Sequence, residues 1–420
     1  MNYISLNLES YNKTTKEYSF NNKFGPNPLI KNNTLYLPEE ILNGIFIANY
    51  KSSSQSNKDN NNIILKKSQE QLLFQNLTKK EPCGLVNIGG ICYMNAVLQC
   101  FFHCKPLTEY FLKIDDKQGL GPISNGYYEL VKGLSTDNSR AACAFKNAMM
   151  EVDDTFIGSE GKDSKDVAIL ILTEMHNELK ENENSLLYGD KTVNPYNKSE
   201  VYNEKKYLDK INGNKTIISE TFHFLLLCEQ KCNFNCQKYS ETFYTVETDN
   251  IIIFELEKIY RDICRKNPNH YRKYPKISLE ECLNHYISEE KIKCPCCNTN
   301  TLLIRKSFCE LPKIFIFVLS RGINAKFDCK INFKSKIDMK SYYKPINKIN
   351  KDNIIYELIG ATFAYDWYKG TGHTVAFCKS FKTYAKNSLY YVFNDSQVRL
   401  TDINEIEGKT PYLLFYERKI

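Results

Sequence analysis

The sequence predicts an α+β fold, because helical periodicity dominates early in the chain and strand-like runs dominate later. Apolar residues recur with helical spacing at 92–102, 163–179 and 279–286. No internal repeat is evident, and the order of elements argues against regular β/α alternation. Runs with the length and composition of strands are Phe222–Leu227, Ile251–Leu256, Ile314–Leu319, Ile354–Phe363, Thr374–Cys378, Leu389–Phe393 and Tyr412–Tyr416.

Length and composition are those of a globular protein with one extended polar stretch. The 420 residues, 42% hydrophobic and 25% charged, exclude disorder throughout and suggest several modules or one large lobed domain. Residues 51–62 contain no apolar side chain, which predicts an exposed linker. We therefore predict an N-terminal extension at 1–79 and a main domain at 80–420. The polar, Asn-rich residues 183–216 are expected to form a surface excursion.

The cysteine content calls for an explanation that depends on the compartment. The longest apolar run, Ile314–Leu319, is far shorter than the roughly 18 residues of a membrane span. The segment Met1–Glu9 lacks the features of a signal peptide, so we expect an intracellular protein, cytoplasmic or nuclear, with no membrane partner. Sixteen cysteines then imply metal binding, catalysis or core filling rather than disulfides. The net charge of +7 is mild and the lysines are spread along the chain, so charge alone predicts no nucleic-acid partner.

Cys92 is the candidate nucleophile. It follows Gly89 and Gly90, which permit a tight turn, and it begins the helical pattern at 92–102. A thiol at a helix N-terminus lies at the positive end of the helix dipole, which stabilises the thiolate. Asn87, earlier on the same turn, is placed to aim its amide at a developing oxyanion. The alternative is that Cys92 is a buried small hydrophobic residue.

His373 is the candidate general base among the six histidines. It follows a glycine-rich turn and begins a strand-like run, so the sheet would hold it while its edge stays open. The next strand-like run ends in Asn394 and Asp395. Either side chain, on a neighbouring antiparallel strand, is placed to orient the imidazole. We expect structural or surface roles for the other five histidines.

These motifs resemble those of the ubiquitin-specific protease family of cysteine deubiquitinases. The family's cysteine box, Gly-Leu-x-Asn-Leu-Gly-Asn-Thr-Cys-Tyr-Met-Asn-Ser-x-Leu-Gln, is similar to Gly84–Gln99 at most positions. Other segments similar to family motifs are 372–374, 390–395 and 411–416 of the histidine box, the strand at 311–321 and, more loosely, the helix at 162–176. The resemblance covers about residues 82–417. The sequence departs from the family pattern at Gly90-Ile91 before the nucleophile and at Thr374 after the histidine.

The resemblance implies a papain-like cysteine protease with a helical thumb, a β-sheet palm and zinc-binding β fingers at roughly 220–315. It implies hydrolysis of the isopeptide bond after the C-terminal glycine of ubiquitin through a thioester acyl-enzyme. Cys92 would be the nucleophile, His373 the base and Asn394 the orienting residue, while Asn87 would donate to the oxyanion. Asp395 is the alternative to Asn394.

Three other interpretations stay open at this point. One is a catalytically weak or inactive scaffold that binds ubiquitin, and another is a protease for a ubiquitin-like modifier. The third, a zinc-dependent nucleic-acid module, rests on the basic balance and the cysteine pairs.

Two cysteine pairs have the spacing of a structural metal site. Cys294 and Cys297 enclose two residues, and Cys232 and Cys236 enclose three, so that together they offer four thiolates for tetrahedral zinc. The family commonly carries such a zinc at the tips of its fingers, so we predict a structural zinc. Rival ligands are Cys228 and Cys296.

Recognition of ubiquitin would involve the thumb and the turn before the histidine. Gly372 is expected to line a narrow channel for the Gly-Gly end of ubiquitin, where side chains would clash. Asp163 and Asp166 are candidates for pairing with basic residues of the ubiquitin tail. Their alternative role is to complement the dipole at a helix N-terminus. The expected partners are ubiquitin and ubiquitinated proteins, and we expect the chain to act as a monomer.

Overall fold

The structure is a computed structural model whose chain divides into two units, Met1–Ser68 and Gln69–Ile420. The described residues are 3–7, 29–31, 34–38, 82–115, 117–136, 138–158, 160–180, 215–233, 236, 242–299, 301–322, 326–344, 354–365, 372–381, 389–407 and 409–419. The predicted linker at 51–62 and most of the excursion at 183–216 lie outside them. So do residues 69–81, and the boundary near residue 80 stays a prediction.

The first unit contains a small antiparallel sheet. Its strands are β1 (Tyr3–Asn7), β2 (Leu29–Lys31) and β3 (Thr34–Pro38). The order is β1-β3-β2, so the central strand pairs with both others.

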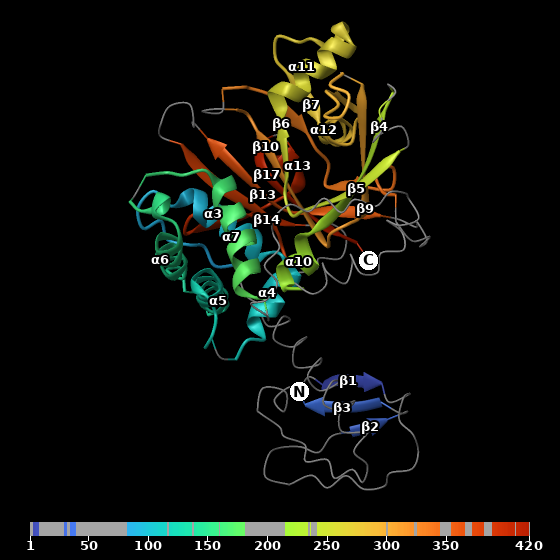
Figure 1. Ribbon diagram of the computed structural model, residues 1–420. Helices are drawn as coiled ribbons and strands as arrows, with labels where there is room; N and C mark the ends of the chain where they lie inside the picture. Colours follow the sequence, from blue (N-terminus) through green and yellow to red (C-terminus); the bar gives the residue numbers. More distant parts are fainter. Residues whose placement is uncertain are drawn as a thin grey trace, which may run out of the picture. The chain divides into compact units, whose positions relative to one another are not determined.

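A helical lobe opens the second unit (Figure 1). Its helices are α3 (Cys92–Phe102), α4 (Lys105–Leu112), α5 (Pro122–Ser135), α6 (Ala142–Val152), α7 (Ser164–Glu178) and α10 (Ile217–Phe222), with the 3-10 turn η1 (Asp154–Phe156) after α6. Their starts follow local chemistry. Pro122 is the first residue of α5, where its missing N–H costs nothing. Asp163 caps α7 by accepting a hydrogen bond from the Lys165 N–H.

An eight-stranded sheet forms the centre of this unit. Its strands are β6 (Ile252–Glu255), β10 (Ile314–Ser320), β12 (Lys336–Asp338), β13 (Ile355–Tyr365), β14 (His373–Lys379), β15 (Tyr390–Asn394), β16 (Gln397–Thr401) and β17 (Pro411–Arg418). The order is β16-β15-β14-β13-β17-β10-β6, and β12 pairs with the start of β13. β6 runs parallel to β10, and the other described pairs in this sheet are antiparallel.

A four-stranded antiparallel sheet corresponds to the predicted fingers. Its order is β5-β4-β9-β8, from β4 (Phe224–Cys232), β5 (Phe243–Asp249), β8 (Glu290–Ile292) and β9 (Leu302–Glu310). Between and after these strands lie α11 (Leu256–Lys266), the 3-10 turn η2 (Pro268–His270), β7 (Lys276–Ser278), α12 (Leu279–Tyr286), β11 (Lys330–Asn332) and α13 (Ile403–Glu407). β7 and β11 pair in parallel.

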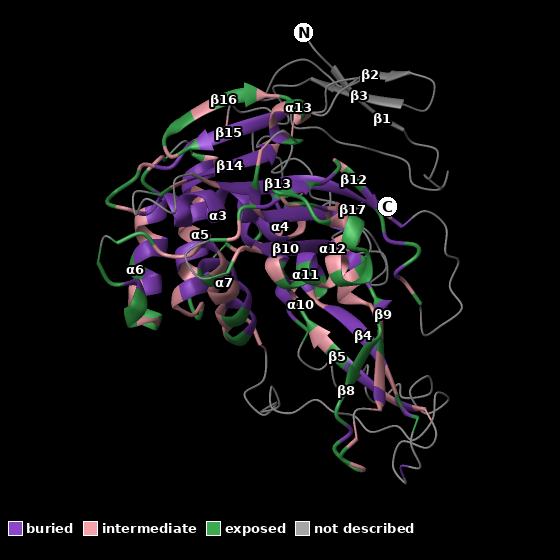
Figure 2. Ribbon diagram, turned by 90° about the horizontal axis from the view of Figure 1, so that it is seen from above, coloured by how far each residue is buried: buried purple, intermediate pink, exposed green. Residues whose placement is uncertain are grey.

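The inner strands of the central sheet are buried and are drawn mainly purple in Figure 2, whereas the edge strand β16 is mostly exposed. Alternate residues of β10 belong to two different hydrophobic clusters, so that Ile316 packs with the helical lobe while Phe315 and Phe317 pack with α11 and α12. α3 therefore lies on one face of the sheet, and α11 and α12 lie on the other.

The predicted α+β class is confirmed, and the helix at 92–102 has the predicted bounds. One strand prediction is partly wrong, because Phe222 ends the helix α10 and β4 begins at Phe224. The reason is a capping box in which Thr216 and Ser219 exchange side-chain and backbone hydrogen bonds and start the helix. In the described part of the chain, no helix is long and apolar enough to cross a membrane.

Phe101 provides a test of the packing between α3 and the central sheet. Its ring is fully buried and makes edge-to-face contacts with Phe222 at 5.7 Å and with Phe415 at 5.3 Å between ring centroids. We predict that Phe101→Ala lowers the free energy of unfolding by about 3–5 kcal/mol in urea denaturation. The control Ile157→Ala removes an apolar side chain that is 57% exposed and should change this free energy little. Equal effects of the two changes would contradict this packing.

Candidate active site

Cys92 is the first residue of α3, and its side chain is largely buried. The turn before it uses two left-handed glycines, Gly89 with φ 123° and Gly90 with φ 63°. The side-chain oxygen of Asn87 accepts hydrogen bonds from the N–H groups of Gly89 and Ile91, both at 3.1 Å. The Asn87 side chain therefore stabilises this turn, whose sequence departs from the family pattern. The same turn places the Cys92 thiol at the helix N-terminus.

His373 and Asn394 lie at the adjoining ends of two neighbouring strands. β14 and β15 pair as far as Ala376 and Phe393, and their ends bring His373 Nε2 to 2.6 Å from Asn394 Oδ1. An amide oxygen only accepts, so Nε2 donates, and the neutral ring keeps Nδ1 as a proton acceptor. Of the two residues that were predicted to orient the histidine, Asn394 forms the hydrogen bond with it, rather than Asp395.

The thiol of Cys92 meets the strand that carries the histidine. Burial raises the pKa of the Cys92 thiol, and a hydrogen bond from the backbone of Thr374, the residue after His373, opposes this effect. The negative charge of Asp395 raises the pKa of Cys92 further, while the N–H of Tyr93 at the helix N-terminus lowers it. Because Thr374 acts through its backbone, the departure from the family's tyrosine leaves this contact unchanged.

Asp395 links the cysteine segment to the turn after β15. Its carboxylate accepts hydrogen bonds from Asn87 Nδ2 at 3.1 Å and from Asn95 Nδ2 at 2.9 Å. Its carbonyl oxygen accepts the N–H of Leu85 at 2.9 Å. Asp395 holds φ at 51°, a left-handed conformation that Asp tolerates better than most residues. One residue thus fixes both the turn before the nucleophile and the helix after it.

Asn95 is a site residue that the sequence interpretation missed. It is 2% exposed within the buried helix α3, and its amide also lies 3.3 Å from the Leu85 carbonyl and 3.4 Å from the Val86 carbonyl. Gly84 is the second such residue, since a Cβ there would lie 2.6 Å from the Asp395 carbonyl oxygen. A polar amide among apolar helix positions was the available signal for Asn95.

The residues predicted to bind the ubiquitin tail lie in three different settings. Asp163 caps α7 through the Lys165 N–H at 2.8 Å, and its two carboxylate oxygens accept the Tyr412 hydroxyl at 2.7 and 2.8 Å. Asp166 is exposed and forms an ion pair with Lys165 at 3.2 Å. Gly372 is exposed beside the histidine. The contact of Asp163 with Lys165 is that of its alternative role at the helix N-terminus, and the Tyr412 hydroxyl of β17 is a second partner.

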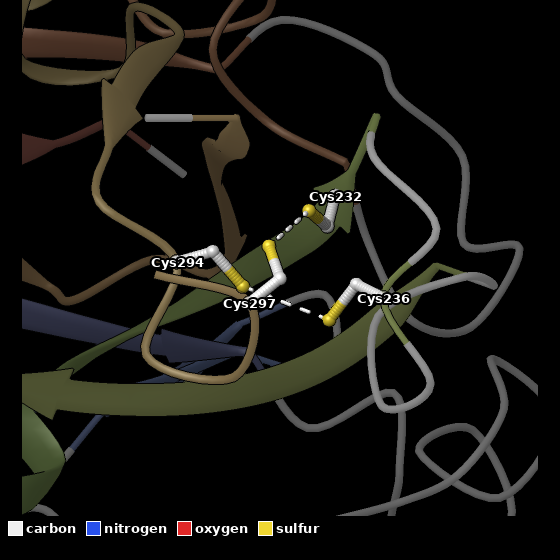
Figure 3. Close-up of side chains that lie close together, drawn as sticks. All are labelled: Cys232, Cys236, Cys294 and Cys297. Atoms are coloured by element: carbon white, nitrogen blue, oxygen red, sulfur yellow. Dashed lines mark hydrogen bonds between the residues drawn. The ribbon is translucent and has the colours of Figure 1, made fainter. Parts of the chain in front are cut away.

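The fingers bring together the four cysteines that were predicted to hold a metal, from β4, from the segment after it and from the turn between β8 and β9 (Figure 3). These are Cys232, Cys236, Cys294 and Cys297, whose Sγ atoms all lie within 4.8 Å of one another. The Sγ atoms of Cys232 and Cys297 are 3.6 Å apart, as are those of Cys236 and Cys294. A tetrahedral zinc with Zn–S bonds of about 2.3 Å requires S···S distances near 3.8 Å. The residues present therefore fit a four-thiolate metal site.

The electrostatics of the cluster also favour a metal ligand set. Hydrogen bonds from Thr299 lower the pKa of Cys297 to about 6, which favours the thiolate that binds metal. The rival ligand Cys228 precedes Cys232 in β4, and burial raises its pKa to about 12. The rival Cys296 is exposed, and neither residue belongs to the cluster.

A helix-borne thiol that contacts the strand carrying a histidine, with that histidine bonded to an amide, is the arrangement of papain-like thiol hydrolases. Residues 83–416 match the family model described as ubiquitin carboxyl-terminal hydrolase, and the chain belongs to this family. The resemblance predicted from the sequence is thereby confirmed.

Comparison with known proteins gives the degree of similarity. Ubiquitin carboxyl-terminal hydrolase 2 of Homo sapiens is 25% identical over 367 residues, which cover 80% of this chain and 54% of that protein. Ubiquitin carboxyl-terminal hydrolase 4 of Mus musculus is 32% identical over 172 residues, covering 38% of this chain and 18% of that protein. The chain thus spans about half the length, or less, of these curated relatives.

Solved structures show the same fold. The SAGA Ubp8/Sgf11/Sus1/Sgf73 DUB module bound to ubiquitin aldehyde matches with a TM-score of 0.56 at 20% identity, covering 80% of this chain and 70% of that chain. A yeast SAGA DUB module with an altered Sgf73 matches with a TM-score of 0.56 at 21% identity, covering 80% and 68%. The papain-like fold class predicted from the sequence is confirmed by this likeness.

The charge and the hydrogen bonds of Asp395 act in opposite directions on catalysis, and Asp395→Asn separates them. Removing the negative charge should lower the pKa of Cys92, so its alkylation by iodoacetamide should begin at lower pH. Losing the charged acceptor for two amides should nevertheless lower kcat by about 10- to 100-fold, since such bonds contribute about 1.5–3 kcal/mol.

Peptide mass spectrometry of Cys92 across pH measures the first effect, and steady-state hydrolysis of a ubiquitin C-terminal amide measures the second. Asp338→Asn, at the exposed end of β12, removes the same charge and should change neither quantity. An unchanged alkylation profile in Asp395→Asn would refute the electrostatic coupling.

Proposed function

We propose that this chain is a deubiquitinating cysteine protease that hydrolyses the isopeptide bond after the C-terminal glycine of ubiquitin. The observation that carries the proposal is the 2.6 Å hydrogen bond between His373 and Asn394. The residue after this histidine, Thr374, contacts the Cys92 thiol through its backbone. Family membership over residues 83–416 supports the choice of ubiquitin as substrate.

The proposed chemistry begins with a proton transfer. The Cys92 thiol gives its proton to His373, and the thiolate attacks the carbonyl carbon of the terminal glycine. The Asn87 amide has one N–H bonded to Asp395 and a second that is available to the oxyanion. The imidazolium then protonates the departing lysine amine, which leaves a thioester on Cys92. His373 next takes a proton from water, and the resulting attack on the thioester releases ubiquitin and restores the thiol.

Asn394 supports these steps by orientation rather than charge. Its oxygen fixes which ring nitrogen carries the proton, but a neutral amide stabilises imidazolium less than a carboxylate would. The carboxylate of the next residue, Asp395, is occupied by two asparagine amides. We infer that the site depends on placement of its groups more than on a strongly stabilised ion pair.

The alternative of an inactive ubiquitin-binding scaffold has less support. The glycine turn departs from the family sequence, yet Asn87 braces it and the contacts that place Cys92 and His373 are intact. Preference for a ubiquitin-like modifier is separated from the main proposal by probes made from each modifier.

We also propose that the four clustered cysteines hold a structural zinc ion. Four thiolates are the donor set that zinc prefers, and the sulfur spacing supports the assignment. The ion would link the end of β4 to the turn between β8 and β9, with no part in the hydrolysis.

The proposed partners and location follow from the same chemistry. One solved neighbour is bound to ubiquitin aldehyde, which supports ubiquitin as a partner of this chain. None of the sixteen cysteines, all within the described residues, forms a disulfide, which supports an intracellular location, cytoplasmic or nuclear, that microscopy of a tagged chain would test. The neighbours belong to multi-subunit modules, so the expectation of a monomer stays a prediction, with light scattering as its test.

Replacing the nucleophile tests the proposed activity. We predict that Cys92→Ala abolishes covalent labelling by a ubiquitin C-terminal electrophile and reduces hydrolysis of di-ubiquitin to background. Cys143→Ala changes a partly exposed thiol on α6 and should leave both reactions unchanged. Undiminished labelling of Cys92→Ala would remove Cys92 as nucleophile. Ubiquitin binding by the unaltered chain with no turnover would favour the scaffold.

Metal analysis tests the zinc proposal. We predict that the purified protein contains one zinc per chain and that Cys294→Ser loses it and lowers the melting temperature. Cys296→Ser changes the exposed neighbour in the same turn and should retain the metal. Zinc content below one-tenth per chain in protein purified without chelator would overturn the proposal.

A further inference from the structure

The segment 256–276 carries a marked local excess of positive charge. Of the 56 Lys and Arg and the 49 Asp and Glu, residues 256–276 hold seven and two, so their net charge is +5. The composition suggested an even spread of charge, but the stretch 326–351, with eight Lys and two Asp, is strongly basic, and so is the segment 256–276. The segment 256–276 comprises α11, the turn η2 and the approach to β7, and we call its exposed side the basic tyrosine surface.

α11 is a helix with one buried face and one cationic face. Leu256, Ile259 and Tyr260 are buried against the central sheet, and on the outer side Arg261 and Arg265 lie one turn apart. Both arginines have acidic neighbours on the same helix, with Glu257 at 2.6 Å from Arg261 and Asp262 at 2.9 Å from Arg265. Exposed pairs of this kind contribute little, so a multivalent anion can replace the acidic partners. Other exposed cations of the segment are Lys258, Lys266, Arg272, Lys273 and Lys276.

Two tyrosine rings stand in solvent beside these cations. Tyr271 is 70% exposed and Tyr274 is 75% exposed, the highest values among the large hydrophobic residues of the described chain. The loop that carries them is fixed, because the Tyr260 hydroxyl accepts the Arg272 N–H at 2.6 Å and lies 3.2 Å from the Arg272 carbonyl oxygen. Lys273 Nζ lies 5.6 Å from the centroid of the Tyr274 ring. Because this loop is fixed while the Tyr271 and Tyr274 rings are exposed, a ligand can contact both rings.

This surface is separate from the active site. The buried side of α11 packs with Phe315 and Phe317, whereas α3 packs with Ile316 on the opposite face of the central sheet. In Figure 1, α11 lies at the end of the unit next to α12 and β7. Occupation of the surface therefore leaves the thiol accessible.

We propose that the basic tyrosine surface binds single-stranded nucleic acid. The cations match a chain of phosphates, and open tyrosine faces stack on bases of any sequence. A duplex hides its bases and would leave both rings unused. An acidic peptide matches the charge but has no row of planar faces for the tyrosines.

Fluorescence anisotropy of the full chain with a labelled 20-nucleotide oligouridylate tests the proposal at several salt concentrations. Binding should weaken steeply with salt, and Lys273→Glu should weaken it at 50 mM salt and reduce the slope of log affinity against log salt by about 0.7. The double change Tyr271→Ala and Tyr274→Ala should weaken binding at least tenfold, since each ring stacks on a base. Hydrolysis of a ubiquitin C-terminal amide should stay unchanged in all these variants.

Lys340→Glu, an exposed lysine outside the segment, is the matched control and should retain full affinity. Three results would each overturn the proposal: absence of binding at 50 mM salt, equal weakening by Lys340→Glu, or binding that the tyrosine changes do not affect. Competition by polyglutamate as effective as that by unlabelled oligouridylate would also overturn it and would indicate an acidic protein partner instead.

Discussion

The carboxylate of Asp395 is the point on which the reactive geometry depends. The nucleophile belongs to a helix near residue 92, and the base belongs to a strand near residue 373, so no local rule brings them together. Asp395 does so with a left-handed backbone, a carbonyl bonded to Leu85 and a carboxylate shared by two asparagines. The arrangement has an electrostatic cost, because the same charge raises the pKa of the thiol that it positions. The arrangement thus favours placement of the groups over stability of the Cys92 thiolate.

The central sheet then separates the tasks of the protein by face. Because side chains alternate along each strand, one face of β10 and β17 receives the catalytic helix and the other receives α11 and α12. Close approach of α3 needs a small residue on β13, and at Gly360 a Cβ would lie only 3.2 Å from the sulfur of Cys100. A larger residue there would push away the helix that carries the nucleophile. A sheet whose inner strands are buried thus supports a reaction on one side and a charged surface on the other.

Local sequence patterns predicted the helices and strands well, but they could not predict contacts between segments that are distant in the sequence. Periodicity located α3 and the strands around His373, because each depends on neighbours within a few residues. The link from Asn95 to Asp395 spans 300 positions and carries no local signal. The choice between Asn394 and Asp395 depended on where β15 ends, a difference of one residue that reverses the side chain's direction. An average over the whole chain likewise concealed the charge collected at 256–276.

The fingers show why spacing alone left several cysteines possible and why burial decides among them. Cys228 and Cys232 are four residues apart on β4, about 13 Å along an extended strand, so one thiol cannot substitute for the other. Among the described residues, the apolar cluster at the tip has two buried side chains besides its cysteines, Phe243 and Leu302. So small a cluster gives little hydrophobic stabilisation to a sheet that extends away from the main core. Four converging thiols at the tip of the fingers can link the strands through a bound metal. This accounts for cysteines at positions where a larger core would have apolar residues.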